Sequence, residues 1–369
     1  MHMKKLLFLI HDLHLGGAEK VLVNLVNNMD HSKFDITVMA LFGGGVNEQF
    51  LKPHIRYQTV FKRVFPGNSH VMKLFSPEIL HKWFIKERYD IEVSYLEGPS
   101  ARIISGCPDK DTKLVSWIHV EQHTAKRASI SFRSYNEALR CYSRFHQTVC
   151  VSEYVKRDFL SIYPSLNNVG VLYNTNETAQ IMEKAAEVAE IRQDALCWCG
   201  VGKLLPSKGF DRMIRIQKRL IDEGYKTHFY ALGEGKQRAE LESLVKELGL
   251  EDSVTFLGYQ TNPYKYVAKC DLFVCASHAE GFSTAATEAL IVGTPVCTVE
   301  VSGMKEMLGS HNEYGIVTEN DEEALYQGIK KLLDNPDLLE HYRRQAAVRG
   351  KDFRTEETVK AVEEMLLGL

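Results

Sequence analysis

The sequence has no long hydrophobic run. Hydrophobic residues make up 44% of its 369 positions, but no uninterrupted apolar stretch approaches the roughly 20 residues that a membrane-spanning helix needs. The short apolar stretch Leu6–Ile10 runs directly into His11 without a small-residue cleavage site, so we expect no signal peptide. These absences favour a cytoplasmic globular protein, and the length favours about two domains.

Cysteine pairs and several catalytic motifs are also absent. None of the eight cysteines forms a C-x-x-C pair, and no His/Cys cluster has zinc spacing. We expect reduced thiols in the core, with a metal or disulfide framework as the open alternative. The Walker loop, the G-x-S-x-G elbow and the H-E-x-x-H motif do not occur, which argues against phosphate-loop enzymes, α/β-hydrolases and zinc proteases.

The net charge is small but unevenly divided. Residues 1–173 hold 22 Lys and Arg against 16 Asp and Glu, and the remainder holds 23 against 32, so the total of -3 divides into +6 and -9. A basic first half favours an anionic partner for that half, either the substrate or a membrane surface. Ordinary solvated charge is the alternative, and we expect no nucleic-acid partner.

Short apolar runs alternate with helical patterns along the chain, as in parallel β-α-β units. We predict an α/β protein with two Rossmann-like, doubly wound parallel sheets that face each other across a cleft and bind ligands at the carboxyl ends of their strands. The strands expected in the first half are Leu6–His11, Phe34–Leu41, Ile91–Leu96, Leu114–His119, Gln147–Ser152 and Val169–Tyr173. Those expected in the second half are Leu196–Val201, Thr227–Leu232, Val254–Leu257, Leu272–Ala276, Val296–Val299 and Gly315–Val317.

A polar passage that begins at Asn174 separates the two halves, and the alternation restarts at Leu196. A helix is expected near Ile181–Ile191, and an amphipathic helix over Thr355–Leu367 with Thr355 as its cap. We predict a first domain over residues 1–175, a linker with a helix over 176–194, a second domain over 195–350, and a helix over 351–369 that returns to the first domain.

Two loops that follow strands are suited to bind phosphate. In IHDLHLGGAEK, Gly16 and Gly17 let backbone amides approach an anion at a helix start, although glycine for the shape of the turn alone is an equal explanation. The full G-x-G-x-x-G pattern is missing, so a dinucleotide fits poorly. In GVGKLLPSKGF, Lys203 follows a strand and Lys208 precedes a helix, so both can neutralise a diphosphate from one loop. Two solvated lysines are the alternative there.

The segment EGFSTAATEAL, residues 280–290, is the most informative part of the chain. Glu280 lies in a Gly-containing loop, and Glu288 lies about one turn inside an Ala-rich helix. Carboxylates accept hydrogen bonds from sugar hydroxyls, while the amides near Phe282 and Ser283 at the helix start suit a phosphate. The segment therefore predicts a nucleotide-sugar ligand, with a buried structural glutamate as the alternative.

A histidine and an acidic pair are further candidates. His119 ends a largely apolar strand, so we expect it at the cleft, positioned to donate to a sugar hydroxyl. A satisfied core histidine is the alternative, and His123 is a weaker candidate. Asp109 and Asp111 match the D-x-D pattern that holds a metal in some sugar transferases, but they precede a strand, at its amino end and away from the cleft. We interpret them as surface residues.

The segment Lys126–Arg144 is a candidate helix that faces the acceptor or a membrane. Its basic residues are Lys126, Arg127, Arg133, Arg140 and Arg144, and its apolar ones are Phe132, Tyr135, Leu139 and Tyr142. Such a mixture fits a surface helix at anionic lipid. The solvated face of an ordinary helix is an equal alternative.

Together these segments resemble glycosyltransferase family 4, a group of retaining transferases with the two-domain GT-B fold. The matching segments are GGAE at Gly16–Glu19, VSEYVKRDFL at Val151–Leu160, VGKLLPSKGF at Val201–Phe210, LGEGKQRAELE at Leu232–Glu242, VTFLGY at Val254–Tyr259, EGFSTAATEAL at Glu280–Leu290 and SGMKEML at Ser302–Leu308. They occur in the family's order and cover nearly the whole chain. The resemblance implies an acceptor-side first domain and a second domain that binds the nucleotide-sugar.

The resemblance also implies a set of site residues. The implied catalytic residues are His119, Lys203, Lys208 and Glu280, and the implied donor-binding residues are Gly16, Gly17, Gly202, Phe282, Ser283, Thr284 and Glu288. Within this set Glu288 matches the ribose-binding glutamate, Glu280 the one that faces the donor sugar, and His119 the histidine beside the transferred sugar. The family works without a bound metal, so we expect no metal or other cofactor.

The sequence departs from the family pattern at two places. Lys203 stands where the family usually has Arg, so a bidentate phosphate contact becomes a point charge. Val120 and Glu121 replace a common His-Asp pair after His119, which blurs the polar groups of the acceptor side.

We hypothesise retaining transfer of a hexose or aminohexose from a nucleoside diphosphate sugar, such as a UDP-sugar, to a surface glycan or its lipid-linked precursor. This would be a cytoplasmic step of cell-envelope polysaccharide synthesis, with peripheral contact at the inner membrane face as an open question. The alternatives are a sugar-nucleotide epimerase of the same fold and a non-catalytic subunit that binds nucleotide-sugar.

Overall fold

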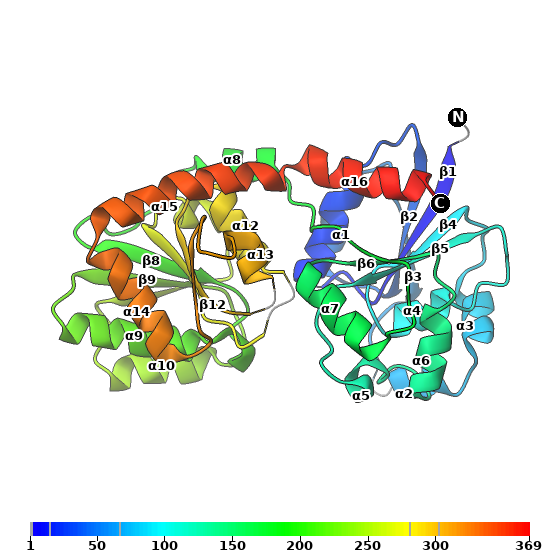
Figure 1. The fold of residues 1–369 in the computed structure, drawn as a ribbon, viewed down its shortest axis with the longest axis horizontal. Coiled ribbons are helices and arrows are strands. Elements are labelled where there is room, and N and C mark those ends of the chain that lie inside the picture. Colours follow the sequence, from blue (N-terminus) through cyan, green and yellow to red (C-terminus); the bar gives the residue numbers. More distant parts are fainter. Residues whose placement is uncertain (1–2, 15, 66–67, 280–281, 302) are drawn as a thin grey trace. The chain divides into compact units, whose positions relative to one another are not determined.

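The computed structural model describes residues 3–14, 16–65, 68–279, 282–301 and 303–369. The chain forms two compact units. Unit 1 runs to Asn176 and also contains Thr355–Leu369, and unit 2 spans Glu177–Arg354. Each unit is a parallel sheet covered by helices (Figure 1), so the predicted α/β class with two parallel sheets is confirmed.

Unit 1 contains a seven-stranded sheet in the order β3-β2-β1-β4-β5-β6-β7. The strands are β1 (Lys4–Ile10), β2 (Phe34–Phe42), β3 (Arg56–Phe61), β4 (Ile91–Ser94), β5 (Lys113–Ile118), β6 (Gln147–Cys150) and β7 (Val169–Val171). All paired strands are parallel. The central strands are apolar and buried on both faces, as a sheet covered by helices requires.

Helices cover both faces of this sheet, with α1 and α16 on one face and α3, α4 and α6 on the other (Figure 1). Their bounds are α1 (Gly17–Asn28), η1 (Val46–Phe50), α2 (Asn68–Lys73), α3 (Pro77–Phe84), α4 (Pro99–Ile104), α5 (Ala125–Ala128), α6 (Tyr135–Tyr142), α7 (Glu153–Ile162) and α16 (Thr355–Leu367). The terminal helix α16 packs against α1. The Glu363 carboxylate of α16 accepts the backbone N–H of Asp30 at 2.6 Å and pairs with Lys33 at 3.2 Å.

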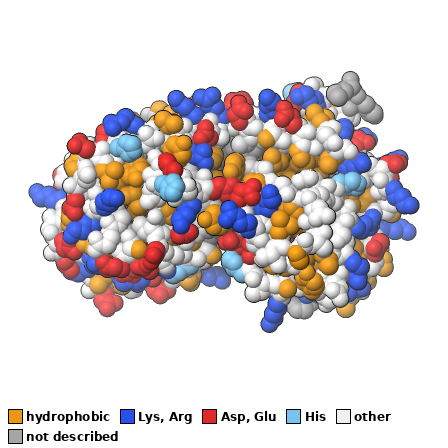
Figure 2. Space-filling view, in the orientation of Figure 1, with side chains coloured by type: hydrophobic (Ala, Val, Ile, Leu, Met, Phe, Trp, Pro, Cys, Tyr) orange, Lys and Arg blue, Asp and Glu red, His pale blue; other side chains and the backbone are white. Residues whose placement is uncertain are grey.

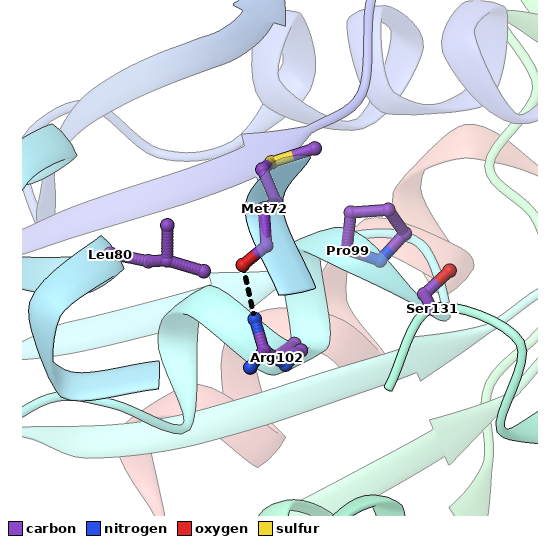
Figure 3. Close-up of a pocket in the computed structure, with 5 residues that line it drawn as sticks. All are labelled: Met72, Leu80, Pro99, Arg102 and Ser131. Atoms are coloured by element: carbon purple, nitrogen blue, oxygen red, sulfur yellow. Dashed lines mark hydrogen bonds between the residues drawn. The ribbon is translucent and has the colours of Figure 1, made fainter. Parts of the chain in front are cut away.

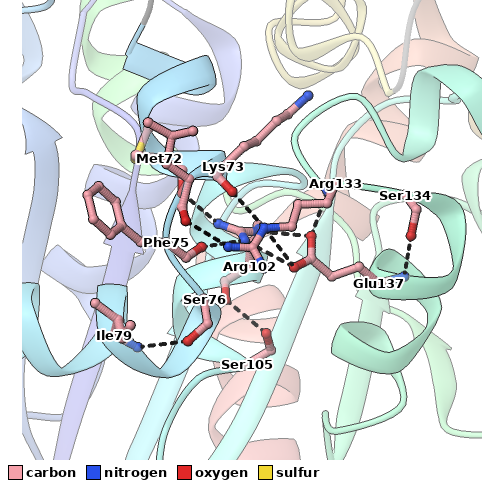
Figure 4. A network of polar contacts seen from close by, with 11 residues as sticks. Met72, Lys73, Phe75, Ser76, Ile79, Arg102, Ser105, Arg133, Ser134 and Glu137 are labelled. Carbon is pink, nitrogen blue, oxygen red and sulfur yellow. Dashed lines mark hydrogen bonds and ion pairs between the residues drawn. The ribbon is translucent and has the colours of Figure 1, made fainter.

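A buried arginine network fixes the turn between α2 and α3 (Figure 4). Arg102 is 1% exposed and forms two hydrogen bonds with Glu137, at 3.1 and 3.0 Å. Its remaining donors reach the carbonyl oxygens of Met72 at 2.9 Å and Phe75 at 2.7 Å. Arg102 also lines a small cavity beneath Met72 and Leu80 (Figure 3). Because the charge is paired and its donors are used, burying this arginine is tolerable.

Unit 2 contains a six-stranded parallel sheet in the order β10-β9-β8-β11-β12-β13. The strands are β8 (Leu196–Val201), β9 (Thr227–Leu232), β10 (Val254–Gly258), β11 (Leu272–Cys275), β12 (Val296–Val299) and β13 (Ile316–Thr318). The helices are α8 (Thr178–Ala185), η2 (Pro206–Lys208), α9 (Phe210–Asp222), α10 (Arg238–Glu247), α11 (Tyr264–Val267), α12 (Thr284–Ile291), α13 (Met304–Leu308), α14 (Glu322–Leu333), α15 (Pro336–Arg349) and η3 (Gly350–Phe353). Figure 1 shows α12 and α15 on one face of the sheet and α9 and α10 on the other.

Two expected elements were wrong and one strand was missed. Strand β3 was missed because Arg56–Phe61 is a polar edge strand without a fully buried position. The helix expected near Ile181–Ile191 ends at Ala185, and it packs on α11 and α12 within unit 2. Lys126–Arg144 does not form one helix, because α5 ends at Ala128 and α6 begins at Tyr135. Within the described ranges, the structure contains no helix with the length and apolar character to cross a bilayer.

Candidate functional site

The loops that follow β8 and β9 interlock at the carboxyl edge of the sheet of unit 2. The N–H of Gly202 donates to the Leu232 carbonyl at 3.0 Å, and the N–H of Leu204 donates to the Glu234 carbonyl at 3.0 Å. Gly233 has a φ of 144°, and a Cβ there would lie 1.8 Å from the Gly202 carbonyl oxygen. Only glycine permits this conformation and this approach. The β8 loop is therefore held rigidly at the edge where parallel sheets bind ligands.

Lys203 and Lys208 both lie on this loop. Lys203 is exposed and Lys208 is half-buried. Lys208 ends η2, and a Cβ added at Gly202 would lie 3.9 Å from its Cγ and Cδ, so the lysine stem runs beside Gly202. The next residue, Gly209, has a φ of 67°, and a Cβ there would meet the Ala276 carbonyl oxygen at 2.1 Å. This close approach ties the loop to the end of β11, next in the sheet.

The start of α12 also lies in unit 2. Ser283 caps this helix because its Oγ accepts the N–H of Ala286 at 3.3 Å, and Thr284 is its first residue. Phe282 is buried and its ring lies 6.0 Å from that of Phe353. Another candidate of this segment, Glu280, lies outside the described residues.

Glu288 lies further along α12 and is 8% exposed. Its Oε1 accepts a hydrogen bond from the Tyr264 hydroxyl at 3.3 Å. Tyr264 belongs to α11, which follows β10, and the sequence analysis did not select it. Its only signal was an aromatic residue after a polar Asn-Pro turn, which is common in loops. Glu288 is therefore a buried carboxylate, and the Tyr264 hydroxyl holds its Oε1 in place.

The glycine turn of unit 1 opens α1, as predicted for Gly16 and Gly17. A Cβ at Gly16 would come 1.9 Å from Oε2 of Glu19, so this carboxylate folds back over the turn. An acidic group near a helix N-terminus is stabilised by the helix dipole. An anion that approached Gly16 would therefore meet the Glu19 side chain first.

His119 directly follows β5 and is 6% exposed. Burial lowers its pKa to about 3, so the ring is neutral at physiological pH. A hydrogen bond to the Tyr95 backbone works in the opposite direction. Nε2 is buried and has no hydrogen-bond partner among the described residues. A neutral imidazole has one donor and one acceptor nitrogen, so Nε2 can serve a hydroxyl in either role.

Glu97 is the neighbour of His119 that the sequence analysis missed. It follows β4, and its Oε2 accepts the backbone N–H of His119 at 3.0 Å while Oε1 accepts from Gln122 at 3.4 Å. Burial raises the pKa of the Glu97 carboxyl. Asp158 of α7 accepts the backbone N–H groups of Gln122 at 2.6 Å and of His123 at 3.0 Å. An acid shortly after the end of β4, with only Tyr95 and Leu96 between, was the available signal.

The two surface predictions for unit 1 have different outcomes. Asp109 and Asp111 form ion pairs with Arg88, at 2.6 and 3.2 Å, and Asp111 is exposed, which agrees with a surface role. In the Lys126–Arg144 segment, Arg133 donates instead to the carbonyl oxygens of Lys73 at 2.6 Å and Leu74 at 2.9 Å (Figure 4). Phe132 and Tyr142 of the same segment are each 2% exposed, so its main aromatic residues belong to the core.

Two family models match successive parts of the chain. The model described as "Glycosyltransferase Family 4" matches residues 15–179, and the one described as "Glycosyl transferases group 1" matches residues 182–349. Each match covers most of one unit. The two matches meet near the division between the units.

Individual proteins are similar as well. An N-acetylgalactosamine-N,N'-diacetylbacillosaminyl-diphospho-undecaprenol 4-alpha-N-acetylgalactosaminyltransferase of Campylobacter jejuni is 36% identical over 200 residues, which is 54% of this chain and 53% of the relative. The lipopolysaccharide core biosynthesis glycosyltransferase LpsD of Rhizobium meliloti is 24% identical over 96% of this chain and 94% of its own length. The chain thus spans about half of the first relative and nearly all of the second.

Solved structures share the fold of the whole chain. The crystal structure of HepE from Anabaena in complex with UDP and glucose has a TM-score of 0.79 at 19% identity and covers 100% of both chains. Sucrose-phosphate synthase from Thermosynechococcus elongatus has a TM-score of 0.78 at 16% identity, over 99% of this chain and 98% of that chain. With both family models matched and this fold shared, the chain belongs to the group 1 and family 4 glycosyltransferases of the GT-B fold.

Proposed function

We propose that the protein transfers an N-acetylhexosamine from its UDP-sugar to a saccharide linked to a polyprenyl diphosphate, with retention at the anomeric carbon. The observation that carries the donor part is the β8 loop of unit 2. This loop holds Lys203 and Lys208 at the carboxyl edge of the sheet, in the same unit as the capped start of α12 and the buried Glu288. Cations, free helix amides and a carboxylate suit a diphosphate and a ribose.

The chemistry follows from where charge builds up. When the bond between the anomeric carbon and the diphosphate oxygen breaks, negative charge grows on the departing UDP. Lys203, Lys208 and the α12 amides can stabilise that charge without reorganisation. The acceptor hydroxyl bonds to the anomeric carbon on the face that UDP leaves, and a phosphate oxygen takes its proton. This route needs no protein nucleophile and no metal.

Glu288 would bind the ribose of the donor. An ionised carboxylate accepts two hydroxyl hydrogen bonds, and the Tyr264 hydroxyl holds Oε1 from the side at 3.3 Å. Glu280 would face the transferred sugar. Gly202, Phe282, Ser283 and Thr284 would complete the donor site through their backbone. Gly16 and Gly17 would approach the donor phosphate only if the Glu19 carboxylate moves aside.

His119 would form a hydrogen bond with a sugar hydroxyl. Its ring is neutral because it is buried, and Nε2 has no partner among the described residues. A neutral imidazole can donate from one nitrogen and accept at the other. The Glu97 carboxylate positions the histidine through the backbone N–H, at 3.0 Å.

The acceptor part of the proposal comes from the relatives. The name of the Campylobacter protein describes an N-acetylgalactosaminyl transfer to a diphospho-undecaprenol saccharide. A chain with a lipid-linked acceptor must reach the membrane surface. The exposed apolar side chains of unit 1 that would contact lipid include Leu74, 74% exposed, Ile130, 69% exposed, and Trp83, 48% exposed. Figure 2 shows hydrophobic and basic side chains mixed on the drawn face of unit 1.

A thermal-shift screen tests the donor assignment. The full-length protein is heated with UDP-, GDP- and ADP-linked hexoses and N-acetylhexosamines. We expect the largest rise in melting temperature with a UDP-N-acetylhexosamine, the proposed donor. A ligand at about a hundred times its Kd stabilises the folded protein by roughly 2.7 kcal/mol. No shift with any nucleotide-sugar would contradict the donor site.

A transfer assay tests the acceptor and the stereochemistry. The selected donor is incubated with short polyprenyl diphosphate saccharides, and the product linkage is read by NMR. We expect a new α-glycosidic bond from an α-linked donor. A β-linked product would rule out retention. An isomerised donor formed without any acceptor would identify an epimerase.

A further inference from the structure

Three buried side chains that the proposed function does not use lie together in unit 1. They are His81, Glu92 and Cys107, with exposed fractions of 6%, 2% and 2%. Nε2 of His81 is 2.8 Å from Oε2 of Glu92, and Sγ of Cys107 is 3.7 Å from Oε1 of the same carboxylate. The three ligand atoms all lie within 4.8 Å of one another. The cluster is therefore compact and closed to solvent.

The three side chains come from separate elements that are each held in place. His81 lies on α3, and Glu92 lies near the amino end of β4, in register between Leu7 of β1 and Leu114 of β5. Cys107 follows α4, and Arg144 donates to its carbonyl oxygen at 2.7 Å. Donors on fixed elements give a preformed site. His119 follows the opposite, carboxyl end of the same sheet.

The donor set matches one class of ligand. Imidazole nitrogen, thiolate sulfur and carboxylate oxygen are the zinc ligands of proteins, at about 2.0–2.1, 2.3 and 2.0–2.2 Å. Three such ligands in a tetrahedral site lie roughly 3.3 to 3.7 Å apart. The sulfur–carboxylate distance of 3.7 Å lies in this range, and the 2.8 Å contact between Nε2 of His81 and Oε2 of Glu92 would have to lengthen when the metal binds. Hard cations such as Mg²⁺ and Ca²⁺ prefer all-oxygen sites, so a thiol argues against them.

The charge of the cluster also suits a divalent cation. A carboxylate buried in a sheet core is costly unless it is paired or coordinates a metal, and in this structure Glu92 pairs with His81 at 2.8 Å. One carboxylate and one thiolate together neutralise Zn²⁺, and a neutral imidazole adds no charge. The Asp109 carbonyl oxygen lies 3.9 Å from the Cys107 sulfur, so it or a water can supply the fourth ligand.

We propose that His81, Glu92 and Cys107 form a structural zinc site in unit 1. Zinc binds as protons leave the thiol and the imidazole for solvent, and the metal joins α3, β4 and the segment after α4. This site lies in the other unit from Lys203 and Lys208. A second cluster, Glu121, His123 and Asp158, contains no sulfur and includes an exposed histidine.

Cobalt spectroscopy of the full-length protein tests the proposal. The protein is produced in zinc-depleted medium with Co²⁺ and purified under reducing conditions, and metal per chain and the absorption spectrum are measured. We expect one cobalt per chain with a thiolate-to-cobalt charge-transfer band. Cys107→Ser should abolish the band and lower metal retention through dialysis about tenfold or more, since even the loss of an outer-shell partner costs 10- to 100-fold.

Matched variants separate this site from the alternatives. Cys150→Ser changes another fully buried cysteine and should keep both the band and the metal. His123→Ala should also keep both. A protein without bound metal, or a band that survives Cys107→Ser, would overturn the proposal. So would metal that gives no band and is lost in His123→Ala, because that result places it at the exposed cluster.

X-ray absorption of the zinc-loaded wild-type protein keeps the test independent of variant folding. The expected first shell contains one sulfur and two or three nitrogen or oxygen atoms. A shell of nitrogen and oxygen alone would exclude Cys107 as a ligand and overturn the proposal.

Discussion

The two units assemble their polar groups in different ways. In unit 2, Lys203 and Lys208 come from one loop, and Glu288 comes from a helix that begins with its own cap. In unit 1, His119 follows β5, Glu97 follows β4 and Asp158 lies on α7, and their contacts form only through the fold. The candidate site of unit 2 is therefore built from locally encoded parts, whereas that of unit 1 exists only after the sheet has formed.

The difference has a physical basis. A diphosphate is bound by backbone amides and cations. In unit 2 one loop supplies both lysines, and the start of one helix supplies the amides. Recognition of an acceptor needs side chains that converge from several strand ends. The charge distribution differs as well, since the second half of the sequence is acidic. Figure 2 shows acidic side chains gathered along the drawn face of unit 2 near α9 and α10, so Lys203 and Lys208 are basic residues in an acidic half.

The sharpest test of the locally encoded site is Lys208→Ala. Removal of one charge-stabilising donor typically lowers turnover by about a hundredfold or more. We expect a loss of this size with an unchanged melting temperature, because Lys208 is only half-buried. Transfer rates at saturating donor measure it.

Two further variants control that experiment. Lys246→Ala removes an exposed lysine of α10 and should leave turnover unchanged. Lys208→Arg keeps the charge and should retain part of the activity. Wild-type turnover in Lys208→Ala would end the phosphate role of this lysine and weaken the comparison between the units.

Glu288→Gln tests the candidate site of unit 2 through its affinity for UDP and not through its turnover. A hydrogen bond to a charged group contributes about 1.5–3 kcal/mol, so the Kd for free UDP should rise about tenfold or more. Calorimetry with UDP measures it, and Tyr264→Phe should give a smaller change because it removes only the bond that orients Oε1. Glu247→Gln on the exposed face of α10 is the matched control. Wild-type affinity in Glu288→Gln would exclude the ribose contact.

In unit 1 the expected effect concerns how the free energy of unfolding changes with pH. Burial lowers the pKa of His119 to about 3, below its ordinary value of about 6.5 in an unfolded chain. The folded state thus favours the neutral ring. Its contribution is fully present above pH 6.5 and is lost as the pH falls from 6.5 towards 3. Between pH 6.5 and 3 this one group lowers the free energy of unfolding by up to about 1.4 kcal/mol for each unit by which the pH falls.

Urea unfolding of His119→Asn and wild type between pH 7 and 4 measures that slope. The variant should show a shallower decline than wild type, because it has no ring to protonate. The exposed His123→Asn exchanges the same side chains at the surface and should follow wild type. Parallel curves for His119→Asn and wild type would show that the ring is not held neutral.

The sequence patterns predict the two parallel sheets correctly because most buried strands are apolar on both faces. They missed β3, whose polar residues lie at a sheet edge. They point to Lys208 and Glu288 as candidates because each lies within a short motif that has its own strand or helix. They missed Tyr264, Glu97 and the zinc candidates, which are partners only in three dimensions. Cys107 and His81 are separated by 26 positions and show no ligand spacing.

The smallest expected effect concerns the D-x-D pair of unit 1. Asp111→Asn breaks one ion pair with Arg88, and both partners are exposed. Exposed pairs contribute little to stability because water and salt screen them. Asp109 and Asp111 lie before the amino end of β5, whereas His119 follows its carboxyl end. We expect wild-type turnover and wild-type urea unfolding for Asp111→Asn, with or without added Mg²⁺. A loss of turnover that Mg²⁺ restores would make this loop a metal-binding part of the reaction, and unit 1 would then also carry a locally encoded site.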